Sequence, residues 1–130
     1  MLERDSWTWS EFSRRGVLRH DGVGSLQGET VLCYGWNVNG IRAVARKGLL
    51  PWKQLPRADI FCLQETKAHV EQLDPEVGEP TGWHAYYSCS QRRGYSGVAI
   101  ISRERPDEIA EGLGVKRLDQ EGRVIRARFG

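Results

Sequence analysis

Four polar residues follow two apolar segments closely enough to form one site. Asn37 and Asn39 come after the apolar segment 30–36, and Glu65 and Lys67 follow the next one. If both segments are neighbouring strands that run in the same direction, their ends meet at one rim, where open α/β sheets bind ligands. A carboxylate supported by an amide oxygen is a partial Mg²⁺ site, because this cation prefers oxygen ligands and keeps several waters. The alternative is a glutamate that is merely exposed or that caps the strand end.

Two basic residues lie in the helical segment predicted after the first strand. Arg42 is near the start of this segment, and Lys47 is one to two turns further along. A helix N-terminus offers free N–H groups and positive partial charge, and an arginine adds a bidentate donor for phosphate. Arg42 and Lys47 are therefore candidate phosphate-binding residues, with an ordinary exposed helix face as the alternative.

A glycine-rich segment, RRGYSG, places two arginines beside Tyr95 at residues 92–97. Basic and aromatic residues on a tight loop suit contact with a nucleic-acid backbone or insertion into a groove, whereas a turn with a packed tyrosine is the alternative. Arg123 begins another arginine-rich segment, 123–128, for which a solvated strand face is the ordinary interpretation.

The elements that would position these residues alternate between strand and helix. We predict strands over 30–36 and 59–65, with a helix between them whose regular part lies near 40–49, because Pro51 breaks or restarts it. This order favours a right-handed crossover between two strands of one sheet, with parallel neighbours as one arrangement. The near-continuous apolar run of 59–65 predicts a central strand with cover on both faces.

Three further strands are predicted towards the C-terminus. The segments 83–89 and 96–102 are joined by a short turn and form an antiparallel hairpin. The segment 122–130 alternates, with Ile125, Ala127 and Phe129 on one face, as in a half-buried strand. A single helix layer would leave apolar side chains of the sheet in water, which forfeits roughly 25 cal/mol per Å². We therefore expect the sequence to be part of a larger sandwich.

The composition is that of one globular domain. Of the 130 residues, 39% are hydrophobic and 28% are charged, and the net charge is +2. So small a net charge does not by itself indicate nucleic-acid binding, because a binding face shows as clustering of charge. Residues 1–29 have mixed charge and no sustained period, so we expect a poorly ordered extension, followed by the domain from residue 30.

The cysteines and the hydropathy bear on the compartment. Cys33, Cys62 and Cys89 are far apart and lack the CxxC spacing of a zinc site, so we predict reduced cysteines in a cytoplasmic protein. No apolar run of the sequence approaches the roughly 20 residues that span a bilayer, so we expect no membrane partner.

Four segments, taken together and in order, resemble the exonuclease III family of AP endonucleases. They are WNVNGIRA (36–43), DIFCLQETK (59–67), GYSGVAIIS (94–102) and DQEGRVIRARF (119–129). This family is a branch of the endonuclease/exonuclease/phosphatase superfamily. The resemblance therefore implies an α/β (α+β) fold, a DNase I-like four-layer sandwich with a mixed sheet, of which residues 30–130 would be the N-terminal half.

The resemblance also implies a role for each matching residue. Glu65 would be the catalytic metal ligand for Mg²⁺, or for Mn²⁺ in its place, and Asn37 would lie beside the metal and the scissile phosphate. Lys67 would support the site. Asn39 stands at a position that is aspartate in some members, where it is linked to metal binding. The implied DNA-binding residues are Arg42, Lys47, Tyr95 and Arg123.

The implied activity is Mg²⁺-dependent hydrolysis of phosphodiester bonds in double-stranded DNA, at abasic sites or 3′ ends, as in base excision repair. The complete enzyme would be monomeric and cytoplasmic, and associated with the nucleoid if bacterial. The family's later tyrosine, its Asp-x-Asn motif and its Asp-His pair belong after residue 130. We therefore expect the 130-residue chain to be truncated and inactive alone, because loss of a general base costs several orders of magnitude in rate.

Two other functions stay open. One is a DNA-binding remnant of the same fold without catalysis, which would use Arg42, Lys47 and Tyr95. The other is a superfamily phosphatase or phosphodiesterase acting on a phospholipid or an inositol phosphate, which the motifs NGIRA, ETK and GYSGV disfavour because they resemble the DNA-repair branch.

Overall fold

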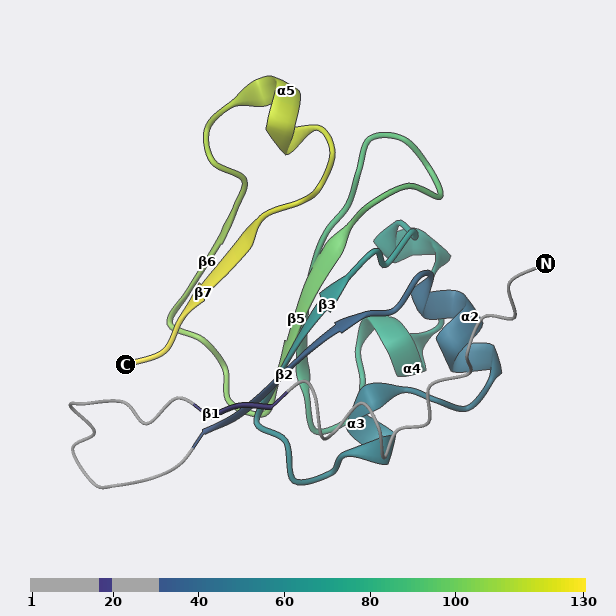
Figure 1. Cartoon of the computed structure of the whole chain (residues 1–130), viewed down its shortest axis with the longest axis vertical. Coiled ribbons are helices and arrows are strands. Elements are labelled where there is room, and N and C mark those ends of the chain that lie inside the picture. The colour runs from purple at the N-terminus through teal and green to yellow at the C-terminus, as the bar shows by residue number, and fades with distance from the viewer. Residues whose placement is uncertain (1–16, 20–30) are drawn as a thin grey trace.

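The computed structural model describes residues 17–19 and 31–130 (Figure 1). The elements in these ranges are, in chain order, β1 (Val17–Arg19), β2 (Leu32–Asn37), α2 (Ile41–Arg46), α3 (Pro51–Gln54), β3 (Ile60–Gln64), the 3₁₀ helix η1 (Val70–Gln72), α4 (Pro75–Gly78), β4 (His84–Ser88), β5 (Val98–Ser102), β6 (Glu108–Glu111), α5 (Lys116–Asp119) and β7 (Ile125–Arg128).

Five strands form one mixed sheet in the order β1-β2-β3-β5-β4, and β6 and β7 form a separate antiparallel pair. In the larger sheet β2 and β3 are parallel, and the other neighbouring strands are antiparallel. The predictions of parallel first and second strands, a central β3 and an antiparallel β4–β5 hairpin are confirmed.

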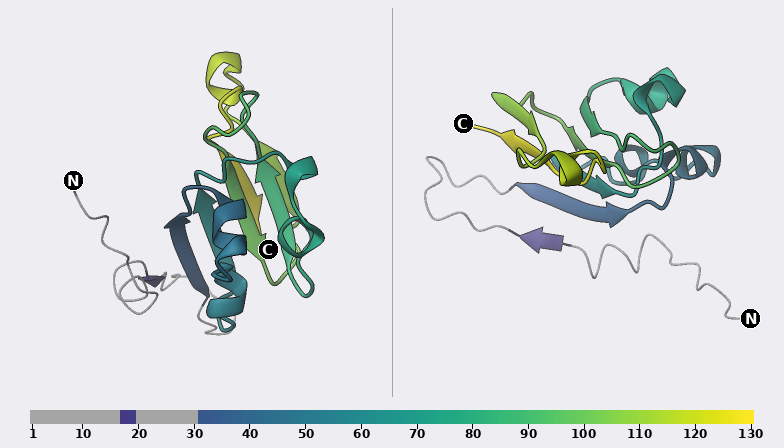
Figure 2. Two further views of the ribbon diagram at one scale, coloured as in Figure 1. Left: turned by 90° about the vertical axis from the view of Figure 1, so that its right-hand side faces the viewer. Right: turned by 90° about the horizontal axis from the view of Figure 1, so that it is seen from above.

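The core lies between one face of the five-stranded sheet and the helices α2, α3 and α4 (Figures 1 and 2). Phe61 and Leu63 of β3 and Ile101 of β5 are at most 1% exposed. They share one apolar cluster with Ile41 of α2 and Trp52 of α3. Alternation along the strands places these apolar side chains on one face of the sheet. The helix α2, which follows β2 in the chain, packs against that face.

The opposite face of the sheet is less covered. Ile60 and Cys62 of β3 are only half-buried. The β6–β7 hairpin lies on this side of the sheet, away from the helices, and β7 contacts β5 (Figure 1). In the part of the chain that the structure describes, the predicted cover of β3 is complete on one face and partial on the other.

The helix after β2 is shorter than predicted. The prediction of regular helix near 40–49 is wrong at its C-terminal end, because α2 ends at Arg46. Gly48 adopts φ +70°, and its N–H donates to the carbonyl of Ala45 at 2.9 Å, as at a glycine-capped helix end. Pro51 then takes the first position of α3, so it restarts the helix, as predicted.

Two strands were not predicted. β6 is short, and its exposed glutamates flank only two half-buried residues. β1 falls within the range 1–29 that was predicted as an extension, and the rest of that range lies outside the described residues. The alternation predicted for the last strand is confirmed for Ile125 and Ala127, which are half-buried while Arg126 is exposed. The prediction is wrong for Phe129, which follows β7 and is 39% exposed. No helix in the described part of the chain has the length and apolar character to cross a membrane.

Candidate metal and phosphate site

The parallel pairing of β2 and β3 brings the two predicted pairs of polar residues to one rim. Asn37 lies opposite Gln64 where the strands end. The pairing then continues, because the N–H of Val38 donates to the carbonyl of Gln64 at 2.9 Å and the N–H of Gly40 to that of Glu65 at 2.8 Å. The sequence-based expectation that both strand ends share a rim is met.

The backbone at this rim is strained. Four non-glycine residues have positive φ: Asn39 at 45°, Glu65 at 52°, Lys67 at 52° and Ser96 at 50°. Such a conformation is uncommon for residues other than glycine, and each instance costs on the order of 1–3 kcal/mol unless the surroundings impose it. Strain of this kind clusters at functional sites, so its concentration here makes the rim a candidate site.

The segment before β5 imposes part of this strain. The N–H of Thr66 donates to the carbonyl of Gly97 at 3.1 Å, and that of Lys67 donates to the carbonyl of Ser96 at 2.8 Å. A Cβ on Gly97 would lie 2.4 Å from Oγ1 of Thr66, so only glycine permits this approach. Thr66 is 1% exposed. The chain carrying Glu65 and Lys67 is therefore held from both sides.

The side chains at the rim form one polar network. The ammonium of Lys67 donates to Oδ1 of Asn39 at 2.6 Å and lies 3.6 Å from Oε2 of Glu65. Oδ1 of Asn37 accepts from the N–H of Asn39 at 3.0 Å. The network thus joins all four predicted residues, and Glu65 stays 45% exposed.

The donor set of this rim fits part of a site for a hard cation. The carboxylate of Glu65 and the amide oxygen of Asn37 are the oxygen ligands that Mg²⁺ takes. In the described ranges no group of three or more His, Cys, Asp or Glu residues could hold a metal ion. These residues would hold a cation only with waters, substrate oxygens or further protein ligands.

A shallow pocket of about 330 Å³ adjoins this rim. Arg42 and Arg46, one turn apart on α2, line it together with Lys67 and Gly94. Lys47 caps the C-terminus of α2 and does not line this pocket. The structure thus brings Arg42 to the rim, but it places Lys47 at the far end of the helix.

The N-terminus of α2 is used differently from the sequence-based expectation. The N–H groups of Gly40 and Ile41 donate to the carbonyls of Glu65 and Thr66, at 2.8 and 3.0 Å. They are therefore not free to bind an anion. These two amides are thus unavailable to a phosphate, whereas the side chains that line the pocket are available.

Tyr95 and Arg123 contact each other on the neighbouring loops. Nη2 of Arg123 donates to the hydroxyl of Tyr95 at 2.8 Å, and its Nε pairs with Glu121. The guanidinium groups of Arg92 and Arg123 lie 5.2 and 5.5 Å from the centre of the tyrosine ring, within the range of a cation–π interaction. Two cations, Arg92 and Arg123, therefore contact the ring of Tyr95.

Arg46 lines the pocket but was not predicted from the sequence as a site residue. Its spacing from Arg42, four positions along a helix, places both on one face and could have identified it. No sequence pattern indicated that Gly97 shapes the rim, because its role depends on the close approach of Thr66 in the fold.

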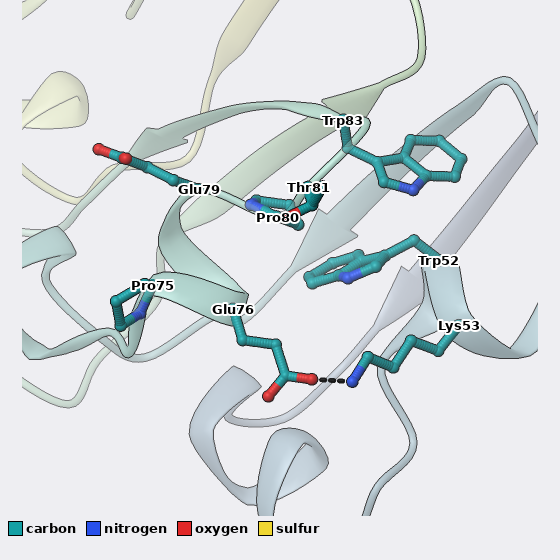
Figure 3. A pocket seen from close by; sticks show the side chains of 8 residues that line it. All are labelled: Trp52, Lys53, Pro75, Glu76, Glu79, Pro80, Thr81 and Trp83. Atoms are coloured by element: carbon teal, nitrogen blue, oxygen red, sulfur yellow. Dashed lines mark ion pairs between the residues drawn. The ribbon is translucent and has the colours of Figure 1, made fainter.

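A second hollow, of about 540 Å³, lies in the helix layer between Trp52 and Trp83 (Figure 3). Lys53 and Glu76 form an ion pair across its mouth. Trp83 directly precedes β4, whose first residue pairs with the last residue of β5. This hollow is therefore at the other end of the sheet from the rim.

Comparison with known proteins agrees with the geometry. The model of the endonuclease/exonuclease/phosphatase family matches residues 35–130. The chain belongs to the endonuclease/exonuclease/phosphatase family. The match includes the whole rim and both loops beside it, and it excludes β1.

Individual relatives within this family are nucleases. The chain is 45% identical over 95 residues to an exodeoxyribonuclease of Bacillus subtilis and 42% identical over 96 residues to the DNA repair nuclease APEX1 of Danio rerio. Each alignment covers 72% of this chain, but only 36% and 31% of the respective relative. The chain thus spans about a third of the length of the relatives it matches.

The fold is likewise shared with solved structures. The APE2 catalytic domain of Xenopus laevis superimposes with a TM-score of 0.62 at 38% sequence identity. The superposition covers 72% of this chain and 37% of the APE2 chain. The predicted fold class, a mixed α/β sheet with part of the DNase I-like architecture, is confirmed.

Proposed function

We propose that this chain contributes the metal-binding and phosphate-binding rim of an exonuclease III-like DNA-repair hydrolase. The observation that carries the proposal is the network at the ends of β2 and β3, where one carboxylate, two amides and one ammonium converge on a strained rim. The names of the relatives, an exodeoxyribonuclease and a DNA repair nuclease, support DNA as the substrate. The proposed substrate is double-stranded DNA at abasic sites or 3′ ends.

We assign Glu65 and Asn37 to a divalent cation, Mg²⁺ or Mn²⁺, on the chemistry of their oxygens. A bound cation would supply charge neutralisation at the scissile phosphate and the leaving oxygen. Lys67 holds Asn39 at 2.6 Å and offers its remaining N–H groups to a phosphate oxygen. Asn39 fixes the side chain of Asn37 through its own N–H.

The proposed DNA contacts surround this rim. Arg42 lines the pocket beside Lys67 and suits a phosphate, to which a guanidinium donates two hydrogen bonds. Tyr95, held by Arg123, offers an aromatic face and a hydroxyl to the duplex. Lys47, at the end of α2, would contact the backbone further away.

The described rim holds one carboxylate, Glu65, which we assign to the cation. Activation of the attacking water requires another base. Because the chain spans about a third of its matched relatives, we propose the activity for the complete domain, to which residues 30–130 contribute and residues 1–29 form an extension. We propose a cytoplasmic monomer, bound to the nucleoid in a bacterium, and the free thiols of Cys33, Cys62 and Cys89 support a reducing compartment.

The test is a chimera that joins residues 1–130 to the remaining part of the Bacillus subtilis exodeoxyribonuclease. We expect it to incise a duplex with a single abasic site when Mg²⁺ is present and to be inactive in EDTA, whereas residues 1–130 alone should not incise. A folded chimera that binds the duplex without cutting it would favour the DNA-binding remnant. Cleavage of inositol phosphates in preference to DNA would favour the phosphatase alternative.

A further inference from the structure

The connection between β6 and β7 exposes an unusual group of apolar side chains. Leu113, Val115 and Leu118 are 64%, 42% and 44% exposed, and they fall within six consecutive residues. The other exposed large hydrophobic residues of the described chain are isolated in the sequence: Val31, Val70 and Phe129. Apolar side chains concentrated on one projecting loop mark a surface for interaction.

Internal hydrogen bonds hold this loop in shape. The carboxylate of Asp119 accepts from the N–H of Leu113 at 2.8 Å and from that of Gly114 at 3.0 Å. A Cβ on Gly112 would lie 2.6 Å from Cγ of Asp119, so the carboxylate sits tightly under the loop. The exposed side chains are therefore presented by a preorganised backbone, which lowers the entropic cost of binding.

The same loop carries two cations, Lys116 and Arg117, and one carboxylate, Asp119, which is hydrogen-bonded to the backbone. Lys116 and Arg117 are exposed, and neither has an ion-pair partner within residues 31–130. In the strands of the same hairpin, by contrast, Arg126 and Arg128 pair with Glu108. Residues 112–120, the tip of the β6–β7 hairpin, thus combine exposed cations with exposed apolar side chains. Such a tip complements a polyanion that also has apolar surface.

A hydrogen bond and a shared loop connect this tip to the rim. The carbonyl of Gln120 accepts from the N–H of Gln91 at 2.8 Å, which joins the tip to the β4–β5 connection. The β4–β5 connection carries Tyr95, and its Gly94 lines the pocket of Arg42. Figures 1 and 2 show α5 and the β4–β5 connection side by side, projecting from the same end of the sheet.

We propose that residues 112–120 form a second DNA-contacting element, in which Lys116 and Arg117 bind backbone phosphates beyond the rim. Leu113, Val115 and Leu118 pack against the deoxyribose faces between those phosphates. The contact is independent of sequence, because it reaches phosphate and sugar and no base edge. This inference rests on the proposed function, since it takes duplex DNA as the ligand.

The test is binding of the 130-residue chain to a fluorescein-labelled duplex, measured by anisotropy over a series of NaCl concentrations. Each phosphate contact contributes about 0.9 to the slope of log K against log[salt]. The double variant Lys116→Ala/Arg117→Ala should therefore lower the slope by roughly 2 and weaken binding at least severalfold. Leu118→Ser should weaken binding without changing the slope, and unchanged affinity would overturn the role given to the apolar side chains.

The matched control is Arg57→Ala/Arg105→Ala, which removes two exposed cations at the other end of the sheet. Arg57 precedes β3 and Arg105 follows β5, and these strand ends pair through Ile60 and Ser102. The control should keep the slope of the unmodified chain. Matching thermal unfolding curves of both double variants would show that the folds are equally intact.

The remaining outcomes separate this inference from the proposed function. If Arg42→Ala/Lys47→Ala weakens DNA binding while Lys116→Ala/Arg117→Ala does not, the inference fails and the proposed function stands. If neither the 130-residue chain nor the chimera binds DNA, both fail. If polyglutamate displaces the labelled duplex as well as unlabelled DNA does, the tip recognises acidic polymers in general, such as an acidic protein partner, and the proposal is overturned.

Discussion

The ammonium of Lys67 donates a hydrogen bond of 2.6 Å to Oδ1 of Asn39, across 28 positions of sequence. This contact ties the residues after β3 to those after β2. The same ammonium lies 3.6 Å from the carboxylate of Glu65. Lys67 would therefore compete with a cation bound to Glu65, and it also holds the side chain of Asn39.

We predict opposite effects of Lys67→Met on metal binding and on catalysis. Two unit charges near 4 Å interact by about 1 kcal/mol in water, so removing the ammonium should raise Mg²⁺ affinity about fivefold. Cleavage by the chimera should nevertheless fall at least tenfold, because Asn39 loses its partner. Calorimetric Mg²⁺ titration and cleavage rates check the two parts. Lys53→Met, which breaks a remote ion pair, should change neither, and weaker Mg²⁺ binding by Lys67→Met would contradict the account.

Gly97→Ala should destabilise the fold by about 2–3 kcal/mol, through left-handed backbone strain and a clash with Thr66. Urea unfolding gives this difference. The matched control is Gly82→Ala, with φ +80° and no atom within 4 Å of its Cβ, which should cost only about 1 kcal/mol. Equal costs for the two substitutions would mean that the close approach at Thr66 is unimportant.

The thiols of Cys33 and Cys62, on neighbouring strands, lie 3.9 Å apart. The hydrogen bond from Cys62 lowers the pKa of Cys33 from 9.0 to about 7, although burial opposes this. The same contact and burial raise the pKa of Cys62. Because the thiolate is the nucleophile, alkylation of Cys33 should be fastest among the three cysteines and should increase from about pH 6 to about pH 8.

Mass spectrometry after brief iodoacetamide treatment measures this pH profile. Cys62→Ala removes the donor, so the midpoint for Cys33 should move upwards, towards the ordinary thiol pKa. A midpoint that stays near pH 7 in this variant would assign the lowered pKa to another cause.

Asp119→Ala should loosen the β6–β7 connection. The carboxylate accepts two backbone hydrogen bonds, and losing them should cost about 1 kcal/mol at this partly exposed position. Hydrogen exchange at Leu113 and Gly114 should accelerate, while exchange at Phe61 stays slow. Asp119→Asn keeps one acceptor oxygen, so exchange at Leu113 and Gly114 should be faster than in the unmodified chain and slower than in Asp119→Ala. Unchanged exchange at Leu113 would show that the loop is held by something else.

The sequence predicted the sheet where strands carry continuous or alternating apolar residues. Phe61 and Leu63 belong to such a strand, and the two-residue period places both on one face. β6 was missed because two half-buried residues between glutamates are too short a pattern to distinguish from loop. Its stability comes from pairing with β7, which is a tertiary contact.

The meeting of the two strand ends at one rim was predictable from the sequence, and the backbone conformation at the rim was not. Asn37 and Glu65 follow from strand ends and parallel pairing. The positive φ of Glu65 and Lys67 has no sequence signal, because neither is a glycine or an asparagine. The use of the first amides of α2 by Glu65 and Thr66 likewise arises only when the chain segments meet.

The central claim is that Glu65 holds the catalytic cation at the rim. The most direct test is the Mg²⁺ dependence of abasic-site incision by the chimera with Glu65→Gln, beside Glu104→Gln as a control carboxylate after β5. We predict that Glu65→Gln raises the Mg²⁺ concentration for half-maximal activity at least tenfold and lowers the maximal rate, while the control changes neither. Full activity of Glu65→Gln at the original Mg²⁺ concentration would contradict the account.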